Sequence, residues 1–220
     1  MPLRKAFMQI GTGNKVKHGV LTKILHRHDR HALDLYLLAL ALATKAPFEV
    51  SYESGMWGRA IGLIGKNSSS TVSRTWRRLT ELNLIARGRR GRKAQIRLLN
   101  EVCDGSNYTP PGLTKGDVYV QIPLAYWLDG HHASLTLPAK AMLLILLSLP
   151  ENYPLPMVRM PKWYGVSADS ADRGLRELRD RGLIDRTPQW ERTPLTGSGF
   201  TKTYRYNLRA PFRRQRSAAK

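Results

Sequence analysis

The sequence is poor in cysteine, in long apolar segments and in acidic residues. A single cysteine, Cys103, stands among 220 residues, so no disulfide can form within the chain, and a reducing cytoplasm is the expected compartment. The first residues lack the apolar segment of a secretory signal. The longest uncharged apolar run, residues 141–150, is far shorter than the ~20 residues that span a bilayer. That run predicts a buried helix instead.

Acidic residues are outnumbered by basic ones. The chain has 16 Asp and Glu against 36 Lys and Arg, a formal net charge of +20. Such an excess is informative about partners rather than about fold, and nucleic acid and an anionic membrane surface are the two candidates. Hydrophobic residues make up 42% of the chain, which is close to the globular norm and argues for a folded protein.

No motif for catalysis or for metal binding stands out. The run HRHDRH at residues 26–31 has Arg27 where the His-hydrophobic-His motif of replication nucleases needs an apolar residue, so a basic, solvated or phosphate-facing segment is expected. The run GTGNK at residues 11–15 is too short for a phosphate-binding loop, and the adjacent His131 and His132 predict a loop. We therefore expect no enzyme, no metal, no cofactor and no small-molecule ligand.

The chain repeats itself at an offset of 99 residues. Residues 68–85 match residues 167–184 in their pattern, with Arg74 aligned to Arg173 and Arg77 to Arg176. Shorter echoes precede both segments in the same order: residues 7–10 with 119–122, and 36–42 with 142–148. This order indicates two copies of one unit, a first unit at about residues 6–100 and a second at about 118–208.

The repeat predicts a division of the chain into four parts. We expect domain 1 at residues 1–103 with a basic N-terminal arm, a linker rich in turn residues at 104–117, domain 2 at 118–208 and a basic tail at 209–220.

Each unit is expected to contain helices followed by a hairpin. In the first unit the predicted helices cover residues 32–43, 54–62 and 68–82; a strand at 84–87, a turn at 88–92 and a strand from 93 follow. The third helix carries an apolar stripe of Val72, Trp76, Leu79 and Leu82. Ser68 is the expected N-cap, and Asn83 and Gly182 occupy matching positions suited to a left-handed helix end. In the second unit a strand at 183–186 leads into a loop at 187–202 and a strand at 203–208.

This order of elements resembles a winged helix, present twice. The resemblance implies a mainly α fold with small β-hairpins (α+β), built from two tandem winged-helix (helix-turn-helix) domains. In such a motif the second helix enters the DNA major groove.

The third helix and hairpin of the first unit form the expected DNA-binding face. Between Lys66 and Lys93 there are nine basic residues, and Glu81 is the only acid, whereas a merely solvated helix mixes signs. The candidate contact residues in this unit are Lys66, Ser69, Ser70, Ser73, Arg74, Arg77 and Arg78 on the helix and Arg89, Arg90, Arg92 and Lys93 in the wing. Arginine can bind guanine with two hydrogen bonds, and Ser can contact base or phosphate.

The second unit has a more balanced charge. Residues 1–103 carry a net +13, residues 104–208 only +2, and the tail +5. Arg173, Arg176 and Lys202 are its candidate DNA contacts, and a dimer surface that lost its charge is the alternative interpretation.

The expected function is sequence-specific binding of double-stranded DNA, most simply as a bacterial transcriptional regulator of the repressor kind, located in the cytoplasm at the nucleoid and able to form a homodimer. The alternative is a plasmid replication initiator that binds repeats at an origin. Residues 135–149 open the second unit in a way similar to iteron-binding initiators, a family in which the first domain dimerises and the second grips DNA. An enzyme acting on nucleic acid and a membrane-surface binder are disfavoured.

Overall fold

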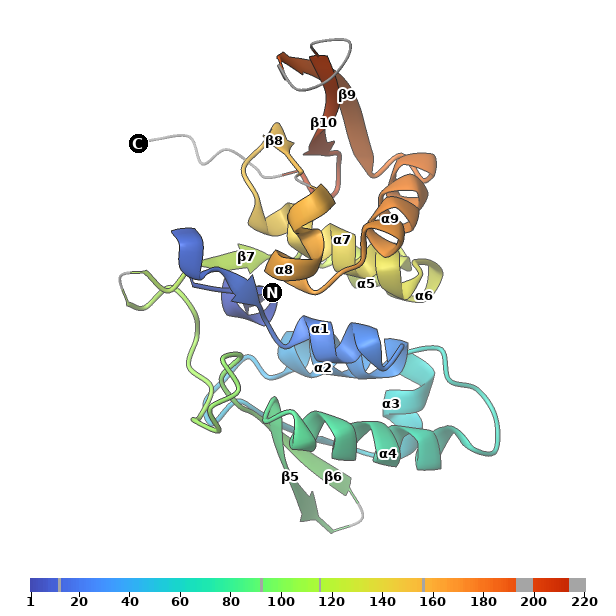
Figure 1. Ribbon diagram of the computed structural model, residues 1–220. Coiled ribbons are helices and arrows are strands. Elements are labelled where there is room, and N and C mark those ends of the chain that lie inside the picture. Colours follow the sequence, from blue (N-terminus) through green and yellow to red (C-terminus); the bar gives the residue numbers. More distant parts are fainter. Residues whose placement is uncertain (12, 92, 115, 156, 193–199, 214–220) are drawn as a thin grey trace, which may run out of the picture.

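The computed structural model describes residues 1–220 except 12, 92, 115, 156, 193–199 and 214–220. Its described part is a mixed α+β fold, with nine α-helices and small antiparallel sheets (Figure 1). The first half contains β1 (Pro2–Arg4), β2 (Gln9–Ile10), β3 (Lys17–His18), α1 (Leu21–His26), α2 (Arg30–Leu42), β4 (Glu49–Tyr52), α3 (Ser54–Ala60), α4 (Ser68–Glu81), β5 (Ile85–Arg90) and β6 (Lys93–Leu98). The second half contains β7 (Tyr119–Gln121), α5 (Ala125–Leu128), α6 (His131–Ser134), α7 (Leu137–Ser148), β8 (Tyr153–Pro154), α8 (Met160–Tyr164), α9 (Ala168–Asp180), β9 (Ile184–Arg192) and β10 (Phe200–Leu208).

The sequence repeat corresponds to a repeat of topology. In the first unit the order is α2, β4, α3, α4, β5, β6, and the three strands form an antiparallel sheet in the order β4-β6-β5. In the second unit the order is α7, β8, α8, α9, β9, β10, and the sheet order is β8-β10-β9. The hairpin of each unit thus gains a third strand from the segment just after the unit's first long helix.

Helix α4 has the predicted apolar stripe on its buried side. Val72, Trp76 and Leu79 are fully buried, and the Trp76 ring meets Trp57 of α3 edge to face at 5.0 Å. The predicted N-cap is wrong: Ser68 is the first helical residue, and the preceding Asn67 makes no side-chain capping bond. In the matching helix α9, Ser167 is the N-cap, and its Oγ accepts from the backbone N–H of Ser170 at 3.2 Å.

Both helices end as predicted. Asn83 and Gly182 have φ values of 55° and 68°, which only a few residue types tolerate without strain. The next residue in each case donates its N–H back across the last turn, Leu84 to Leu79 at 3.1 Å and Leu183 to Leu178 at 2.9 Å.

The hairpins are longer than the sequence predicts. Strand β5 runs to Arg90, so Arg89 and Arg90 lie on the strand and not in a turn. Strand β9 runs to Arg192 and β10 begins at Phe200, so the described part of the expected loop at 187–202 is paired strand throughout. Strand β6 begins at Lys93 as predicted, and its side chains alternate, with Ala94, Ile96 and Leu98 buried. Cross-strand pairing extended these strands past the Gly and Pro residues that favoured a turn.

The two histidine-containing segments singled out in the sequence lie at helix ends. His131 and His132 begin the short helix α6, which corrects the predicted loop. In the run at residues 26–31, Asp29 is the N-cap of α2 and accepts from the N–H of Ala32 at 3.1 Å.

The two halves share one continuous hydrophobic core. The most deeply buried helices, α2 and α7, lie at its centre and are joined by an ion pair between Asp34 and Lys140, both fully buried, at 2.5 Å. Burial raises the pKa of Asp34 and lowers that of Lys140, and each charge opposes the shift of the other. Among the described residues, no helix has both the length and the apolar character needed to cross a membrane.

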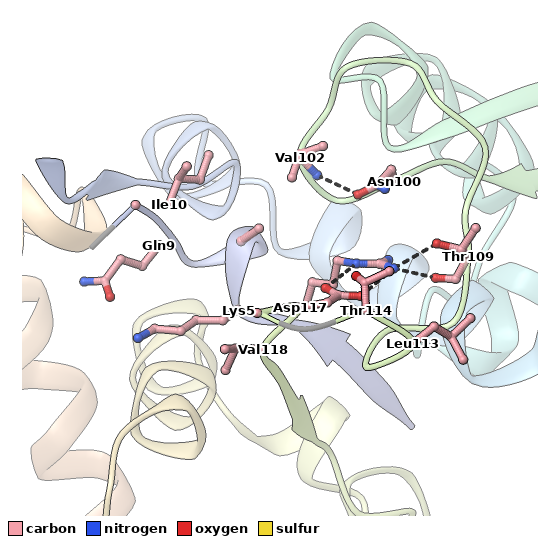
Figure 2. A pocket seen from close by; sticks show the side chains of 14 residues that line it. Lys5, Gln9, Ile10, Asn100, Val102, Thr109, Leu113, Thr114, Asp117 and Val118 are labelled. Atoms are coloured by element: carbon pink, nitrogen blue, oxygen red, sulfur yellow. Dashed lines mark hydrogen bonds and ion pairs between the residues drawn. The ribbon is translucent and has the colours of Figure 1, made fainter. Parts of the chain in front are cut away.

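The N-terminal residues are part of this packing. Strand β1 pairs with β7, so Leu3 lies opposite Val120 of the second unit. Arg4 is 5% exposed and binds Glu101 at 2.7 Å and Asp117 at 2.9 Å. Its guanidinium also donates to Thr109, and Arg4, Thr109 and Asp117 help to line a pocket between the first residues and the segment 100–118 (Figure 2). Arg4 therefore ties the expected linker to the core instead of belonging to a free basic arm.

Candidate nucleic-acid interface

The exposed side of α4 carries cations without acidic partners. Arg74 and Arg77 lie on the solvent side of the helix, opposite the stripe of Trp76, and neither forms an ion pair within the described residues. Lys66, Ser69 and Ser70 are exposed at the N-terminal end of the helix, and Ser73 is half-buried. Exposed donors at a helix N-terminus favour an anion, because the helix dipole and the free N–H groups add to the field of the cations.

Arg78 differs from its neighbours. Its guanidinium binds the carboxylate of Asp29, the N-cap of α2, and donates to the Thr75 hydroxyl at 3.0 Å. This side chain holds α4 against α2, so its charge is neutralised within the protein. Among the predicted arginine contacts on α4, Arg78 is the one that is paired with an acid in the part of the chain that the structure describes.

The β5–β6 hairpin extends the basic surface beyond α4. Arg90 and Lys93 stand directly opposite each other across the two strands, and Arg89 is exposed on the neighbouring position. Like charges placed opposite each other destabilise a hairpin unless an anion lies between them. Arg92 lies outside the described residues.

Arg87 connects the hairpin to the helix and was not among the predicted contacts. It lies on the same face of the hairpin as Arg89, two residues further on, and is exposed. Its guanidinium makes two long hydrogen bonds to Ser73 of α4, 3.4 Å to the carbonyl oxygen and 3.5 Å to Oγ. The signal for Arg87 was available in its period-two spacing from Arg89. We refer below to Ser73, Arg74, Arg77, Arg87 and Arg89 as the α4 face.

Acids lie at the margins of this surface. Glu81, at the C-terminal end of α4, pairs with Arg27 at 3.6 Å. Glu49 of β4 lies on the other face of the sheet, where it accepts from Gln95 at 2.9 Å. The α4 face therefore keeps its positive charge unscreened by carboxylates of the described chain.

The matching helix of the second unit is neutralised by its own acids. Arg173 pairs with Asp169 at 3.2 Å and Arg176 with Asp172 at 2.5 Å, each one turn away along α9. Two further arginines pair with acids at the end of the same helix: Arg179 with Asp180 at 3.1 Å and Arg181 with Glu177 at 3.2 Å. The predicted contacts Arg173 and Arg176 are exposed as expected, but their charges are balanced.

The remaining candidate of the second unit, Lys202, lies apart from the α4 face. Lys202 is exposed on β10, opposite Trp190 of β9. The hairpins β5–β6 and β9–β10 project from opposite ends of the molecule, so the structure does not combine the two sets of predicted residues into one surface (Figure 1). The start of the tail is packed on the second unit, where Phe212 is buried and Arg209 pairs with Asp185 at 2.6 Å.

Two features of the described residues bear on metal binding and nucleophilic chemistry. Within the residues described, no group of three or more His, Cys, Asp or Glu side chains is arranged to hold a metal ion. Cys103 is half-buried, and burial raises the pKa of its thiol to about 11, which keeps it protonated and poorly nucleophilic at neutral pH. Comparison of the chain with protein-family models, with curated proteins and with solved structures gives no match.

Proposed function

We propose that this protein is a sequence-specific double-stranded DNA-binding protein made of two tandem winged-helix domains, and that it acts as a bacterial transcriptional regulator of the repressor kind. The observation that carries the proposal is the α4 face, where Arg74 and Arg77 of the helix and Arg87 and Arg89 of the adjoining strand have no acidic partner among the described residues, whereas Arg78 is paired with Asp29. The order α2, β4, α3, α4, β5, β6 and the three-stranded sheet support the winged-helix assignment.

In this arrangement α4 is the helix that enters the major groove. Helix α3 packs against it through the contact between Trp57 and Trp76, as the first helix of a helix-turn-helix does. Arg74 and Arg77 face outward and can reach base edges, where arginine pairs with guanine O6 and N7. Arg87 and Arg89 then lie along the flanking phosphates, and Arg90 and Lys93, on the other face at the end of the hairpin, reach the phosphates beyond them.

A comparison of two single substitutions in the full chain tests the roles of helix and wing. Changing Arg77 to Ala removes a base contact, so binding to the cognate duplex weakens by roughly 1–3 kcal/mol and binding to random DNA by much less. Changing Arg90 to Ala removes a phosphate contact, so both duplexes lose affinity about equally and the salt slope flattens by about one unit. Cognate DNA comes from selection of a random duplex library against the protein.

The salt dependence of binding tests the electrostatic part. With five or more phosphate contacts, we expect log K to fall with log salt with a slope steeper than about −4. Fluorescence anisotropy of a labelled duplex across a salt series measures this slope. A slope near zero, together with unchanged binding by the Arg77 variant, would contradict the proposal.

A plasmid replication initiator is the second candidate. The repetition of one topology in tandem, with a hairpin at each end of the molecule, favours a protein that engages DNA through both units (Figure 1). Footprinting separates the candidates, because an initiator protects direct repeats beside an AT-rich segment, whereas a repressor protects an inverted repeat over a promoter.

A further inference from the structure

The hairpin of the second unit exposes a tryptophan. Trp190 is 63% exposed on β9, whereas Trp57 and Trp76 of the first unit are fully buried. Large aromatic side chains are normally covered in a soluble domain, and an exposed one beside cations is typical of a binding surface. Trp190 is also the tryptophan that the rest of the fold does not use for packing.

Strand register places other aromatic and basic side chains on the same face. Directly opposite residues share a face, so Trp190 lies with Lys202, Pro188 with Tyr204, and Arg186 with Tyr206. The Lys202 ammonium is 5.5 Å from the centroids of both the Trp190 and the Tyr204 rings, and the Arg186 guanidinium is 4.2 Å from that of Tyr204. We call Arg186, Trp190, Lys202 and Tyr204 the aromatic face.

The aromatic face continues the buried side of the hairpin into solvent. Tyr206 is 9% exposed at the base, Tyr204 is half-buried, and Trp190 is exposed further out. The other side of the hairpin is occupied by polar contacts, in which Arg205 binds Gln189 and Thr203 donates to the Gln189 carbonyl oxygen at 3.3 Å. Polar side chains on one side of the hairpin therefore bond to each other, whereas the aromatic side presents exposed ring and cationic groups to solvent.

The corresponding hairpin of the first unit has a different chemistry. Arg87 and Arg89 stand where the second unit has Arg186 and Pro188, and the first hairpin carries no aromatic residue in β5 or β6. A purely cationic strand suits the phosphates of a duplex. Aromatic rings need a flat partner, and a duplex keeps the faces of its bases stacked on each other. Unpaired bases offer such faces, and the phosphates beside them suit Lys202 and Arg186.

We propose that the aromatic face binds single-stranded DNA, with bases stacked on Trp190 and Tyr204 and with phosphates held by Lys202 and Arg186. Charge and ring chemistry together select this ligand: cations alone would serve any phosphate backbone, and rings alone would serve any apolar partner. The site is separate from the α4 face, and it gives the chain two DNA sites of different kinds at opposite ends (Figure 1).

Binding of the full chain to labelled oligothymidine tests the site. Trp190→Ala should weaken binding to oligothymidine by about 5- to 100-fold, in line with the loss of one stacked base, and should change binding to random duplex by less than about twofold. Trp190→Phe retains a ring and should recover most of the affinity. Arg77→Ala is the matched control: it weakens duplex binding and leaves oligothymidine binding unchanged, so failure of the duplex proposal is recognised separately.

Two probes isolate the contribution of the bases. An abasic strand of the same length offers no base to Trp190 or to Tyr204, so it should bind the unaltered protein at least as weakly as oligothymidine binds the Trp190→Ala variant. Oligothymidine, but not the abasic strand, should quench the fluorescence of Trp190. Equal binding of the abasic and base-carrying strands would overturn the proposal. So would equal losses on single strand and duplex in the Trp190→Ala variant, which would place the hairpin in the duplex interface. If Trp190→Ala weakens binding to vesicles of anionic phospholipid but leaves binding to oligothymidine unchanged, the face is a membrane-binding surface. This result would also overturn the proposal.

Discussion

Helices α4 and α9 occupy matching places in the two units and are held there by matching contacts of opposite charge. In the first unit Arg78 of α4 binds Asp29, the N-cap of α2. In the second, Glu177 of α9, at the corresponding position, accepts from the N–H of Thr136 at 3.1 Å and from its hydroxyl, and Thr136 is the N-cap of α7. The fold thus requires a polar contact at this point but not a particular sign of charge.

The exposed sides of the two helices diverge further. Within the described part of the chain, the exposed Arg74 and Arg77 of α4 have no acidic partner, whereas Arg173 and Arg176 of α9 are each opposed by a carboxylate. An exposed pair of this kind adds only about 0–1 kcal/mol to stability, so the acids on α9 are not needed to hold the helix together. The difference between the helices therefore concerns what each surface attracts. Four predictions test the comparison of the two units, three of them in the core and the last at these surfaces.

The largest effect is expected in the core beneath α4. Changing Trp76 to Ala removes a fully buried ring that packs on Trp57, so the free energy of unfolding should fall by roughly 3–5 kcal/mol. Urea denaturation followed by circular dichroism measures the change. Leu175 occupies the corresponding place in α9, and Leu175→Ala should cost slightly less because a smaller side chain is removed. DNA binding by Trp76→Ala should fall only as far as folding does; a variant that stays fully folded would mean that the faces of α4 are assigned wrongly.

A second prediction asks whether the two units are thermodynamically separate. Changing Lys140 to Met leaves the buried Asp34 with Arg30, at 3.5 Å, as its one remaining ion-pair partner among the described residues, so the unfolding free energy should fall by about 3–5 kcal/mol. Changing both Asp34 to Leu and Lys140 to Met removes the unpaired charge and should restore most of the loss. A single cooperative transition is expected in each variant, because the pair joins one continuous core. Two separate transitions in the unaltered protein would contradict this.

A third prediction concerns how closely the helices approach. Gly174 of α9 faces α7 so closely that a Cβ would lie 2.5 Å from the carbonyl oxygen of Pro138, whereas Thr75 fills the matching position in α4. Gly→Ala inside a helix normally stabilises by roughly 0.5–1 kcal/mol. Here we expect Gly174→Ala to destabilise by about 1–3 kcal/mol, because backbone must move to admit the methyl group. Thr75→Ala, as the contrasting variant, removes atoms without creating a clash. Thermal denaturation of both variants tests the sign.

Much of this comparison could be predicted from the sequence. The repeat, the stripe of Trp76 and the helix ends at Asn83 and Gly182 depend on neighbours within one or two turns, where periodicity and backbone preference decide the structure. Strands β4 and β8 were missed because they are only four and two residues long, too short for alternation to register. The length of β9 depends on pairing with a distant strand, which local turn signals do not report.

The candidate site was predictable to a similar extent. Exposure of Arg74 and Arg77 follows from the helical stripe, and it was predicted correctly. The engagement of Arg78 by Asp29 was not predictable, because it joins residues 49 positions apart in the sequence. The exposure of Trp190 was also missed, since a tryptophan is more often buried and only the register of a long hairpin places it outside.

The smallest effect is expected where the acids of α9 are neutralised. Changing Asp169 and Asp172 to Asn leaves Arg173 and Arg176 without their partners and makes the second unit more positive by two charges. Because exposed pairs contribute little to stability, the unfolding free energy should change by less than about 1 kcal/mol. Binding to random duplex should tighten by a few-fold at low salt, and the salt slope should steepen, since freed arginines add counterion-releasing contacts. The same change in Glu81, which lies at the end of the already basic α4, serves as the control and should have less effect.

If neutralising Asp169 and Asp172 leaves duplex affinity unchanged while Arg77→Ala weakens it, α9 does not contact duplex DNA at all. The division of labour between the α4 face and the second unit is then complete.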